Sequence, residues 1–183
     1  MLYIIYYVLS KFFGNNVLVS FYRKLGMTIG ENTHIFSKIV SSEPFMISIG
    51  SNTTISTGVT LLTHDASVGA VLGRNVYSDV VGPISIGHNC FIGAYAVLLY
   101  GIKIPDRSII AAGTVVTKTV CKHLKGSNEE NRGIVFGGNP ARFICYTDEL
   151  LVKRNSSFLK LHGQNKEQRR RIILDNKDKW IIR

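Results

Sequence analysis

Aliphatic residues recur at every sixth position through the middle of this 183-residue chain. In the clearest stretch the column runs without a gap through Ile86, Ile92, Leu98, Ile104, Ile110 and Val116. Four residues after each of these stands a small or β-branched residue, namely Cys90, Ala96, Ile102, Ser108, Thr114 and Val120. The same spacing appears upstream, at Ile29 and Ile35 and again at Ile49, Ile55 and Leu61. Two columns in one register indicate a structural repeat.

A repeat of six residues excludes an α-helix, whose faces recur every 3.6 residues. A short strand followed by a tight turn fits this length, and three such units close one triangular coil of about 18 residues. Gly, Asn and Asp recur at the expected corners, as at Asn32, Asn52 and Asn89, and tolerate the left-handed backbone angles of sharp turns. An ordinary antiparallel β-domain would instead alternate with a period of two. The sequence therefore predicts a mainly β fold, a parallel β-helix of stacked coils.

Four segments make the chain resemble the left-handed parallel β-helix hexapeptide-repeat acyltransferases. They are residues 84–94 (ISIGHNCFIGA), 98–104 (LLYGIKI), 109–118 (IIAAGTVVTK) and 137–142 (GGNPAR). The resemblance is strongest to the small O-acetyltransferases that act on sugars and cell-surface polysaccharides. It implies a left-handed β-helix acyltransferase domain at residues 26–145, between an apolar and aromatic N-terminal segment at 1–25 and a basic helical tail at 146–183.

The sixfold register breaks after Leu61, because the interval from Leu61 to Ile86 is one position longer than a multiple of six. Residues 67–83 are therefore expected to leave the coil as a loop, and loops on a rigid scaffold often carry function. His64 stands just before this exit. A neutral imidazole can remove a hydroxyl proton at neutral pH, and the resemblance implies that this histidine is the general base. Asp65 would fix the ring tautomer, although a backbone carbonyl would serve equally well.

The resemblance also implies a cosubstrate, acetyl-CoA, whose pantetheine arm lies along a coil edge while a cation meets its phosphates. The candidate binding residues are Ala94, Gly101, Ala112, Thr117, Lys118 and Arg142. Turn geometry is the alternative reason for each of them. The acceptor oxygen would attack the thioester directly, and a backbone amide near Gly101 would stabilise the oxyanion. We therefore expect neither an acyl-enzyme nor a metal.

The net charge of +10 is concentrated at the two ends of the chain. Residues 148–183 hold ten Lys or Arg against five Asp or Glu, and residues 1–25 hold three bases and no acid. A peripheral contact with an anionic membrane is one interpretation, and a solvated basic surface is the other. For the apolar start, packing on the main domain is favoured over a position in a membrane interface. No nucleic-acid-binding motif accompanies the charge, so no nucleic-acid partner is expected.

Three further features bear on location and assembly. The chain has no run of about 18 apolar residues that could span a bilayer and opens with no signal-peptide pattern. Its three cysteines fit a reducing compartment. We therefore expect a cytoplasmic protein, free or peripheral at the inner face of the cell membrane. The resemblance implies a homotrimer with active sites between subunits and a saccharide acceptor.

Other functions stay open at this point. The acceptor could be the amine of an amino sugar, or the β-helix could bind a saccharide without catalysing a reaction. A zinc hydratase on the same fold would need three converging imidazoles, but the candidates His64, His88 and His123 include no close pair. His34 and His88 fall at turn positions of the repeat, where a structural role is expected.

Overall fold

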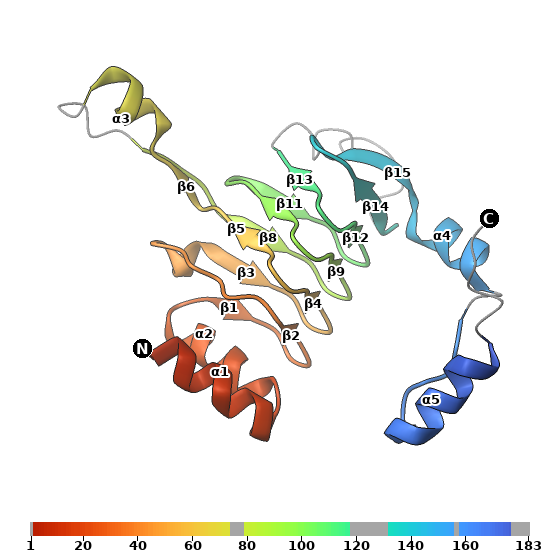
Figure 1. Cartoon of the computed structure of the whole chain (residues 1–183). Coiled ribbons are helices and arrows are strands. Elements are labelled where there is room, and N and C mark those ends of the chain that lie inside the picture. The colour runs from red at the N-terminus through yellow and green to blue at the C-terminus, as the bar shows by residue number, and fades with distance from the viewer. Residues whose placement is uncertain (1, 74–78, 118–131, 156–157, 177–183) are drawn as a thin grey trace. The chain divides into compact units, whose positions relative to one another are not determined.

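Three parallel β-sheets form the three sides of a coiled prism in the computed structural model, which describes residues 2–73, 79–117, 132–155 and 158–176 (Figure 1). The first side contains β1 (Thr28–Ile29), β3 (Ile47–Ile49), β8 (Ile84–Ile86) and β11 (Ile102–Ile104). The second contains β5 (Thr60–Leu61), β10 (Val97–Leu98) and β13 (Val115–Val116). The third contains β2 (His34–Ile35), β4 (Thr54–Ile55), β9 (Phe91–Ile92), β12 (Ile109–Ile110), β14 (Ile134–Gly137) and the antiparallel β15 (Arg142–Tyr146). The predicted mainly β fold with parallel sheets is confirmed.

Strands of neighbouring regular coils pair at a separation of three sixfold repeats, as Ile92 does with Ile110. Two interruptions change this separation. Ile29 pairs with Ile49, two positions beyond the regular spacing, and the extra chain lies between β2 and β3, where the short 3-10 helix η1 (Pro44–Met46) occurs. Ile49 pairs with Ile86, at slightly more than twice the regular spacing, because the chain leaves this coil between β5 and β8. The first coil is therefore lengthened slightly and the second is opened widely.

The aliphatic column forms the core of the prism. Each of its eleven members between Ile29 and Val116 is at most 6% exposed. Burying such a side chain contributes about 1.5–3 kcal/mol, so the repeated column stabilises every coil in the same way. Two inward threonines donate to carbonyls of the next coil, Thr33 to Gly50 at 2.7 Å and Thr53 to Gly87 at 2.8 Å. The buried hydroxyl of Thr114 has no such partner among the residues that the structure describes.

The corners of the prism follow the same period. Asn89, Tyr95, Gly101, Arg107 and Gly113 stand at successive sixth positions, and each has a φ between 55° and 72°. Glycine adopts this left-handed conformation without strain and asparagine tolerates it. Tyr95 and Arg107 are therefore costly occupants of two corners, which the corner residues predicted from the sequence did not include.

Two helices precede the first coil, α1 (Leu2–Phe13) and α2 (Asn16–Lys24). Helix α2 packs against β1 and β2 and buries Leu18, Val19, Phe21 and Tyr22. Helix α1 packs on α2 through its tyrosines, since the ring of Tyr6 lies 4.7 Å from that of Phe21. Figure 1 shows both helices at the N-terminal end of the prism.

Polar side chains from this helical region meet the backbone of the first coil at three places. The pairs are Arg23 with the carbonyl of Ile29, Asn15 with both backbone groups of Ile35, and Tyr22 with the carbonyl of Ser37 and the amide of Ile39. All five contacts measure 2.7–2.9 Å. A strand of another coil would otherwise bond to these groups, so the side chains take the place of a preceding coil.

The chain leaves the second coil as an antiparallel arm. Strand β6 (His64–Asp65) pairs with β7 (Val80–Val81), and helix α3 (Ser67–Leu72) lies beyond them. The arm projects away from the stacked coils in Figure 1. It begins at His64 itself, three residues before the loop expected from the sequence at 67–83.

The chain divides into two compact units, Met1–Thr147 and Asp148–Arg183. The smaller unit contains most of α4 (Thr147–Arg154) and all of α5 (Lys166–Asp175). The side chain of Asn165 accepts from the Gln168 amide at the start of α5, as a helix cap does. Within the described ranges, no helix combines the length and the apolar character needed to cross a membrane.

Candidate active site

His64 stands where the antiparallel arm leaves the β-helix. Its Nδ1 lies 3.0 Å from Oε2 of Glu43, and the two side chains are 37% and 23% exposed. A carboxylate only accepts hydrogen bonds, so Nδ1 carries the proton of the neutral ring and donates it to Glu43. Nε2 is then the basic nitrogen, and no residue in the described part of the chain is bonded to it.

Glu43 is itself held by two hydroxyl groups. Thr63, which is buried, donates to Glu43 Oε2 at 2.6 Å. The Ser41 hydroxyl lies 2.7 Å from that of Thr63 and accepts from the Glu43 amide. Since Thr63 gives its only proton to Glu43, Ser41 must donate to Thr63. The hydrogen bonds from Thr63 and then His64 hold the pKa of Glu43 below its usual value, so this carboxyl is ionised at neutral pH.

Asp65 makes a different contact from the one expected for it. Its Oδ1 accepts from the backbone amide of Ser67 at 2.9 Å, and this bond lowers the pKa of Asp65. Because the side chains of neighbouring strand residues point to opposite faces, the carboxylate of Asp65 lies on the other face of the strand from the ring of His64. The contact with Nδ1 comes from Glu43, on the preceding coil.

Glu43 was not among the candidates drawn from the sequence. It lies between Ile35 and Ile49, and the interval between these two is two positions longer than a multiple of six. The break in register that led to His64 therefore has a smaller counterpart at Glu43. A search for every break in the column, rather than for the largest one, would have found both members of the pair.

The small residues predicted to accept the cosubstrate lie along both edges of the second side of the prism. Gly101 follows β10 on the same edge on which His64 follows β5. Gly82 packs closely against Gly101, because a Cβ atom added to Gly82 would lie 2.9 Å from the Gly101 amide nitrogen. Ala94 and Ala112 lie on the other edge, before β10 and β13. The Gly113 amide donates to the Ala94 carbonyl at 2.8 Å, and this hydrogen bond joins the turn before β13 to the turn before β10.

The residues expected near phosphate are only partly described. Thr117 follows β13 and so shares an edge with Gly101 and His64. Lys118 lies outside the described residues. Arg142 is exposed at the start of β15, and its guanidinium donates to the Ala141 carbonyl at 3.2 Å. The Ala141 amide donates to Val115 of β13, so the Arg142 segment adjoins the last regular coil.

Cys90, His88 and His34 have structural contacts. Cys90 is buried, and burial raises the pKa of its thiol to about 11, so it is protonated at neutral pH. His88 accepts from the Ser51 amide at 3.0 Å and so joins two coils at a corner. His34 lies in strand β2 and not at the turn expected for it, and its ring stacks on Phe36. Across the described ranges, no three His, Cys, Asp or Glu side chains gather as metal ligands would.

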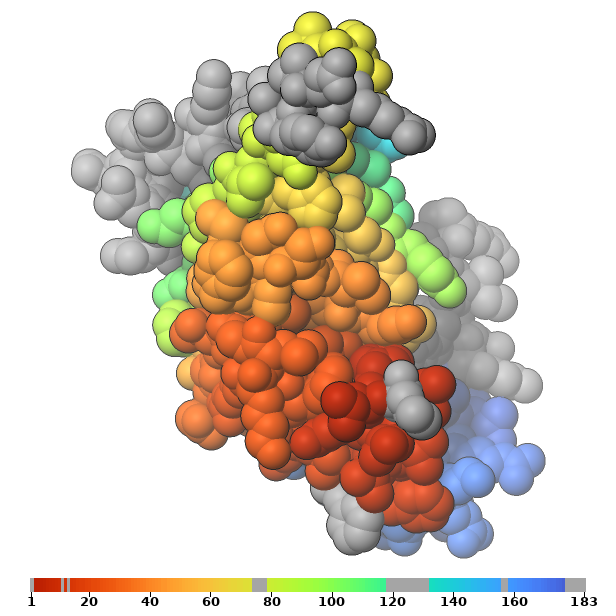
Figure 2. Space-filling view, turned by 90° about the vertical axis from the view of Figure 1, so that its left-hand side faces the viewer, coloured from red at the N-terminus to blue at the C-terminus, as the bar shows by residue number. Residues whose placement is uncertain are grey.

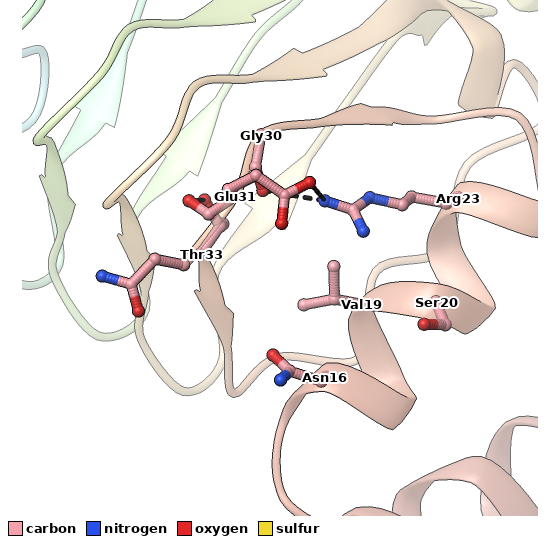
Figure 3. A pocket seen from close by; sticks show the side chains of 8 residues that line it. Asn16, Val19, Ser20, Arg23, Gly30, Glu31 and Thr33 are labelled. Atoms are coloured by element: carbon pink, nitrogen blue, oxygen red, sulfur yellow. Dashed lines mark hydrogen bonds and ion pairs between the residues drawn. The ribbon is translucent and has the colours of Figure 1, made fainter.

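A pocket of about 470 Å³ lies between α2 and the first corner of the prism (Figure 3). Its lining includes Arg23 and Glu31, which form an ion pair at 3.2 Å, and none of the predicted site residues. The Arg23 guanidinium also donates to the carbonyls of Ile29 and Gly30. Its charge and its donors are therefore engaged, and the described lining residues offer no free cation to an anionic ligand.

Known proteins resemble this chain in both sequence and fold. Residues 83–118 match the family described as "Hexapeptide repeat of succinyl-transferase". The protein CapG of Staphylococcus aureus is 32% identical over 162 residues, which cover 86% of this chain and 87% of CapG. The galactoside O-acetyltransferase of Escherichia coli strain K12 is 35% identical over 94 residues, 50% of this chain and 45% of that enzyme.

A solved galactoside acetyltransferase in complex with coenzyme A has a similar structure. It superposes with a TM-score of 0.55 at 26% identity, over 75% of this chain and 73% of the enzyme. The sixfold column, the parallel coils and the extended likeness to CapG agree with one another. The chain therefore belongs to the hexapeptide-repeat acyltransferase family.

Proposed function

We propose that this protein is an acetyl-CoA-dependent O-acetyltransferase that acts on a saccharide hydroxyl, in a cell-surface polysaccharide or its precursor. The Glu43–His64 pair carries this proposal, because it presents a basic Nε2 at the edge of the prism that also holds Gly101 and Thr117. The likeness to a galactoside acetyltransferase with bound coenzyme A supports the choice of cosubstrate and acceptor class.

In the proposed reaction His64 Nε2 removes the proton of the acceptor hydroxyl, and Glu43 stabilises the imidazolium that forms. The acceptor oxygen then bonds to the thioester carbonyl carbon, and a backbone amide near Gly101 donates to the resulting oxyanion. The C–S bond breaks as the carbonyl re-forms, and coenzyme A leaves as a thiolate that takes the proton from His64. Glu43 acts here as a positioning residue, in the role first expected of Asp65.

We assign the cosubstrate to the edges described above. Ala94, Ala112 and Gly101 leave space for the pantetheine arm beside the backbone. Thr117, Lys118 and Arg142 would meet the phosphates, where a lysine acts as a point charge. The left-handed backbone angle at Gly101 is by itself a sufficient reason for a glycine at this position. Measurements of acetyl-CoA binding must therefore test whether Gly101 also contacts the cosubstrate.

We further propose a left-handed β-helix that assembles as a homotrimer, with each active site between two subunits and the protein on the cytoplasmic side. Apolar groups on the outside of the coils support assembly, since Tyr95 is 69% exposed and Val97, Leu99 and Tyr100 are only half-buried. In such a trimer His64 would face the acetyl-CoA edge of a neighbouring subunit. Sedimentation velocity tests this directly, and a monomer would contradict it.

The function is tested by release of free thiol from acetyl-CoA in the presence of a panel of saccharides, including amino sugars. We expect turnover with a hydroxyl acceptor and a loss of about 10²–10⁴-fold in kcat for His64→Ala. His34→Ala is the matched control, because His34 is also a strand histidine near the first coils but stacks on Phe36.

Each alternative has its own outcome in this assay. Normal turnover by His64→Ala would remove the general base from the mechanism. Acetyl transfer only to amines, seen by mass spectrometry of the product, would make the protein an N-acetyltransferase. Saccharide binding without thiol release would make it a non-catalytic binding protein.

A further inference from the structure

Most of helix α1 turns its apolar side chains away from the fold. The exposed large side chains of this helix are Leu2, Ile4, Ile5, Tyr7, Val8, Leu9 and Phe12, at 38–79%. Among the side chains of α1 that the structure describes, Tyr3, Tyr6 and Ser10 are half-buried. They recur at helical spacing and mark the face that packs on α2. An apolar patch of this kind on one helix marks a surface that contacts something else. Figure 2 shows the dark red residues of α1 at the surface of the molecule.

Lysine amines lie beside α1. The chain contains no Asp or Glu before Glu31, whereas Lys11, Arg23 and Lys24 all precede that residue, and Arg23 is paired with Glu31 at 3.2 Å. The Lys24 amine lies 3.4 Å from the Tyr6 hydroxyl, and the Lys38 amine lies 5.6 Å from the centre of the Tyr3 ring. Amines therefore flank the aromatic base of α1. Two copies of this face would repel one another, while an anionic surface would complement it.

The length of α1 decides between crossing a bilayer and lying on it. Twelve residues at about 1.5 Å each span roughly 18 Å, well short of the hydrocarbon core of about 30 Å. Tyrosines prefer the boundary between headgroups and acyl chains, and Tyr7 is exposed on the outward face. We propose that α1 binds flat in the surface of an anionic lipid bilayer, with its outward apolar face among the acyl chains and the basic residues at headgroup depth.

This inference is independent of the proposed reaction, because it uses neither His64 nor the coil edges. It resolves the choice left open for residues 1–25, since one face of α1 packs on the fold while the other meets the membrane. The basic helix α5, with Arg169, Arg170 and Arg171, offers a second candidate for lipid binding, and it must be tested separately.

The test measures sedimentation of the full-length protein with vesicles. Phosphatidylcholine vesicles that contain phosphatidylglycerol are compared with pure phosphatidylcholine vesicles, at low and at high salt. We expect binding to the anionic vesicles, at least about tenfold weaker binding to the neutral ones, and a decrease with salt. The variant Ile5→Gln/Val8→Gln/Phe12→Gln should bind the anionic vesicles at least about tenfold more weakly. Glutamine preserves helix propensity, so α1 should still form.

The matched control is Val40→Gln/Leu151→Gln/Val152→Gln, which removes three exposed apolar side chains elsewhere and should bind as the wild type does. A second full-length variant, Arg169→Gln/Arg170→Gln/Arg171→Gln, should retain binding. The proposal is overturned if the wild type does not sediment with anionic vesicles, or if the α1 variant binds as well as the wild type. It is also overturned if binding is lost only in the arginine variant, or if the α1 substitutions change the oligomeric state without affecting vesicle binding.

Discussion

The regular coils at residues 84–117 and the two interrupted coils before them perform different tasks. In the regular coils each strand pairs with the strand three repeats further on, and the column residues are completely or almost completely buried. The interrupted coils place more chain between their paired strands, and the additional segments include Glu43 and the arm that starts at His64. The comparison teaches that the repeat provides the scaffold, while insertions into it position the proposed catalytic groups.

The largest expected effect concerns the regular part. Ile92 is fully buried between β4 and β12, and Ile92→Ala should lower the free energy of unfolding by about 2–5 kcal/mol because it leaves a cavity. The folded variant should keep its kcat, which denaturant titration and the thiol assay would measure together. Ile144→Ala, at a residue that is 59% exposed, is the control and should change stability by less than about 0.5 kcal/mol. If Ile92→Ala lost kcat while its stability was unchanged, the regular coils would have a direct role in catalysis, and the proposed division between scaffold and catalytic insertions would be wrong.

An intermediate effect is expected at the interruption. Glu43→Ala should lower kcat on the order of 100-fold, less than the loss of the base itself, with little change in the KM for acetyl-CoA. Nitrogen NMR should show the His64 proton moving from Nδ1 to a mixture of both nitrogens. Glu43→Gln should recover part of the activity, because its amide oxygen can still accept from Nδ1. Equal activity of both variants and the wild type would remove Glu43 from the mechanism.

The smallest expected effect lies at a corner of the regular coils. Arg107 has a φ of 60°, and Arg107→Gly should raise the free energy of unfolding by ~0.5 kcal/mol, because relief of strain exceeds the entropy cost of glycine. Asn89→Gly, at a φ of 55°, is the matched control and should be close to neutral, since asparagine tolerates this conformation. Thermal unfolding of the two variants gives the comparison. A larger gain for Asn89→Gly would show that corner strain is not the cause.

The sequence predicts the scaffold well because the scaffold repeats. Six aliphatic positions in one register are enough to specify the strands, the buried column and the coil of three repeats. Each coil repeats the same local interactions, so one position that departs from the pattern does not change the predicted structure, because the equivalent positions in neighbouring coils still indicate it. The N-terminal helices, by contrast, have no repeat to support them, and their packing through Tyr6, Phe21 and Tyr22 becomes visible only in three dimensions.

The partner of His64 could not be read from adjacency. Asp65 is next in the chain, but alternation along a strand turns it away from the ring, and it bonds to Ser67 instead. Glu43 lies far earlier in the chain and reaches His64 because one coil stacks on the next. Stacking converts a sequence distance of about one coil into contact, so partners in a β-helix should be sought at that distance.

The three side chains that complete the first coil also bear on how the molecule avoids its own polymerisation. A solenoid of parallel strands offers unpaired amides and carbonyls at its end, and a second solenoid could add there coil upon coil to make a fibre. Asn15, Tyr22 and Arg23 occupy backbone groups of the first coil at Ile29, Ile35, Ser37 and Ile39. At the other end, β15 closes the third sheet with the opposite strand direction. A few side chains thus occupy backbone groups at the N-terminal end of the repeat, where another solenoid would otherwise add.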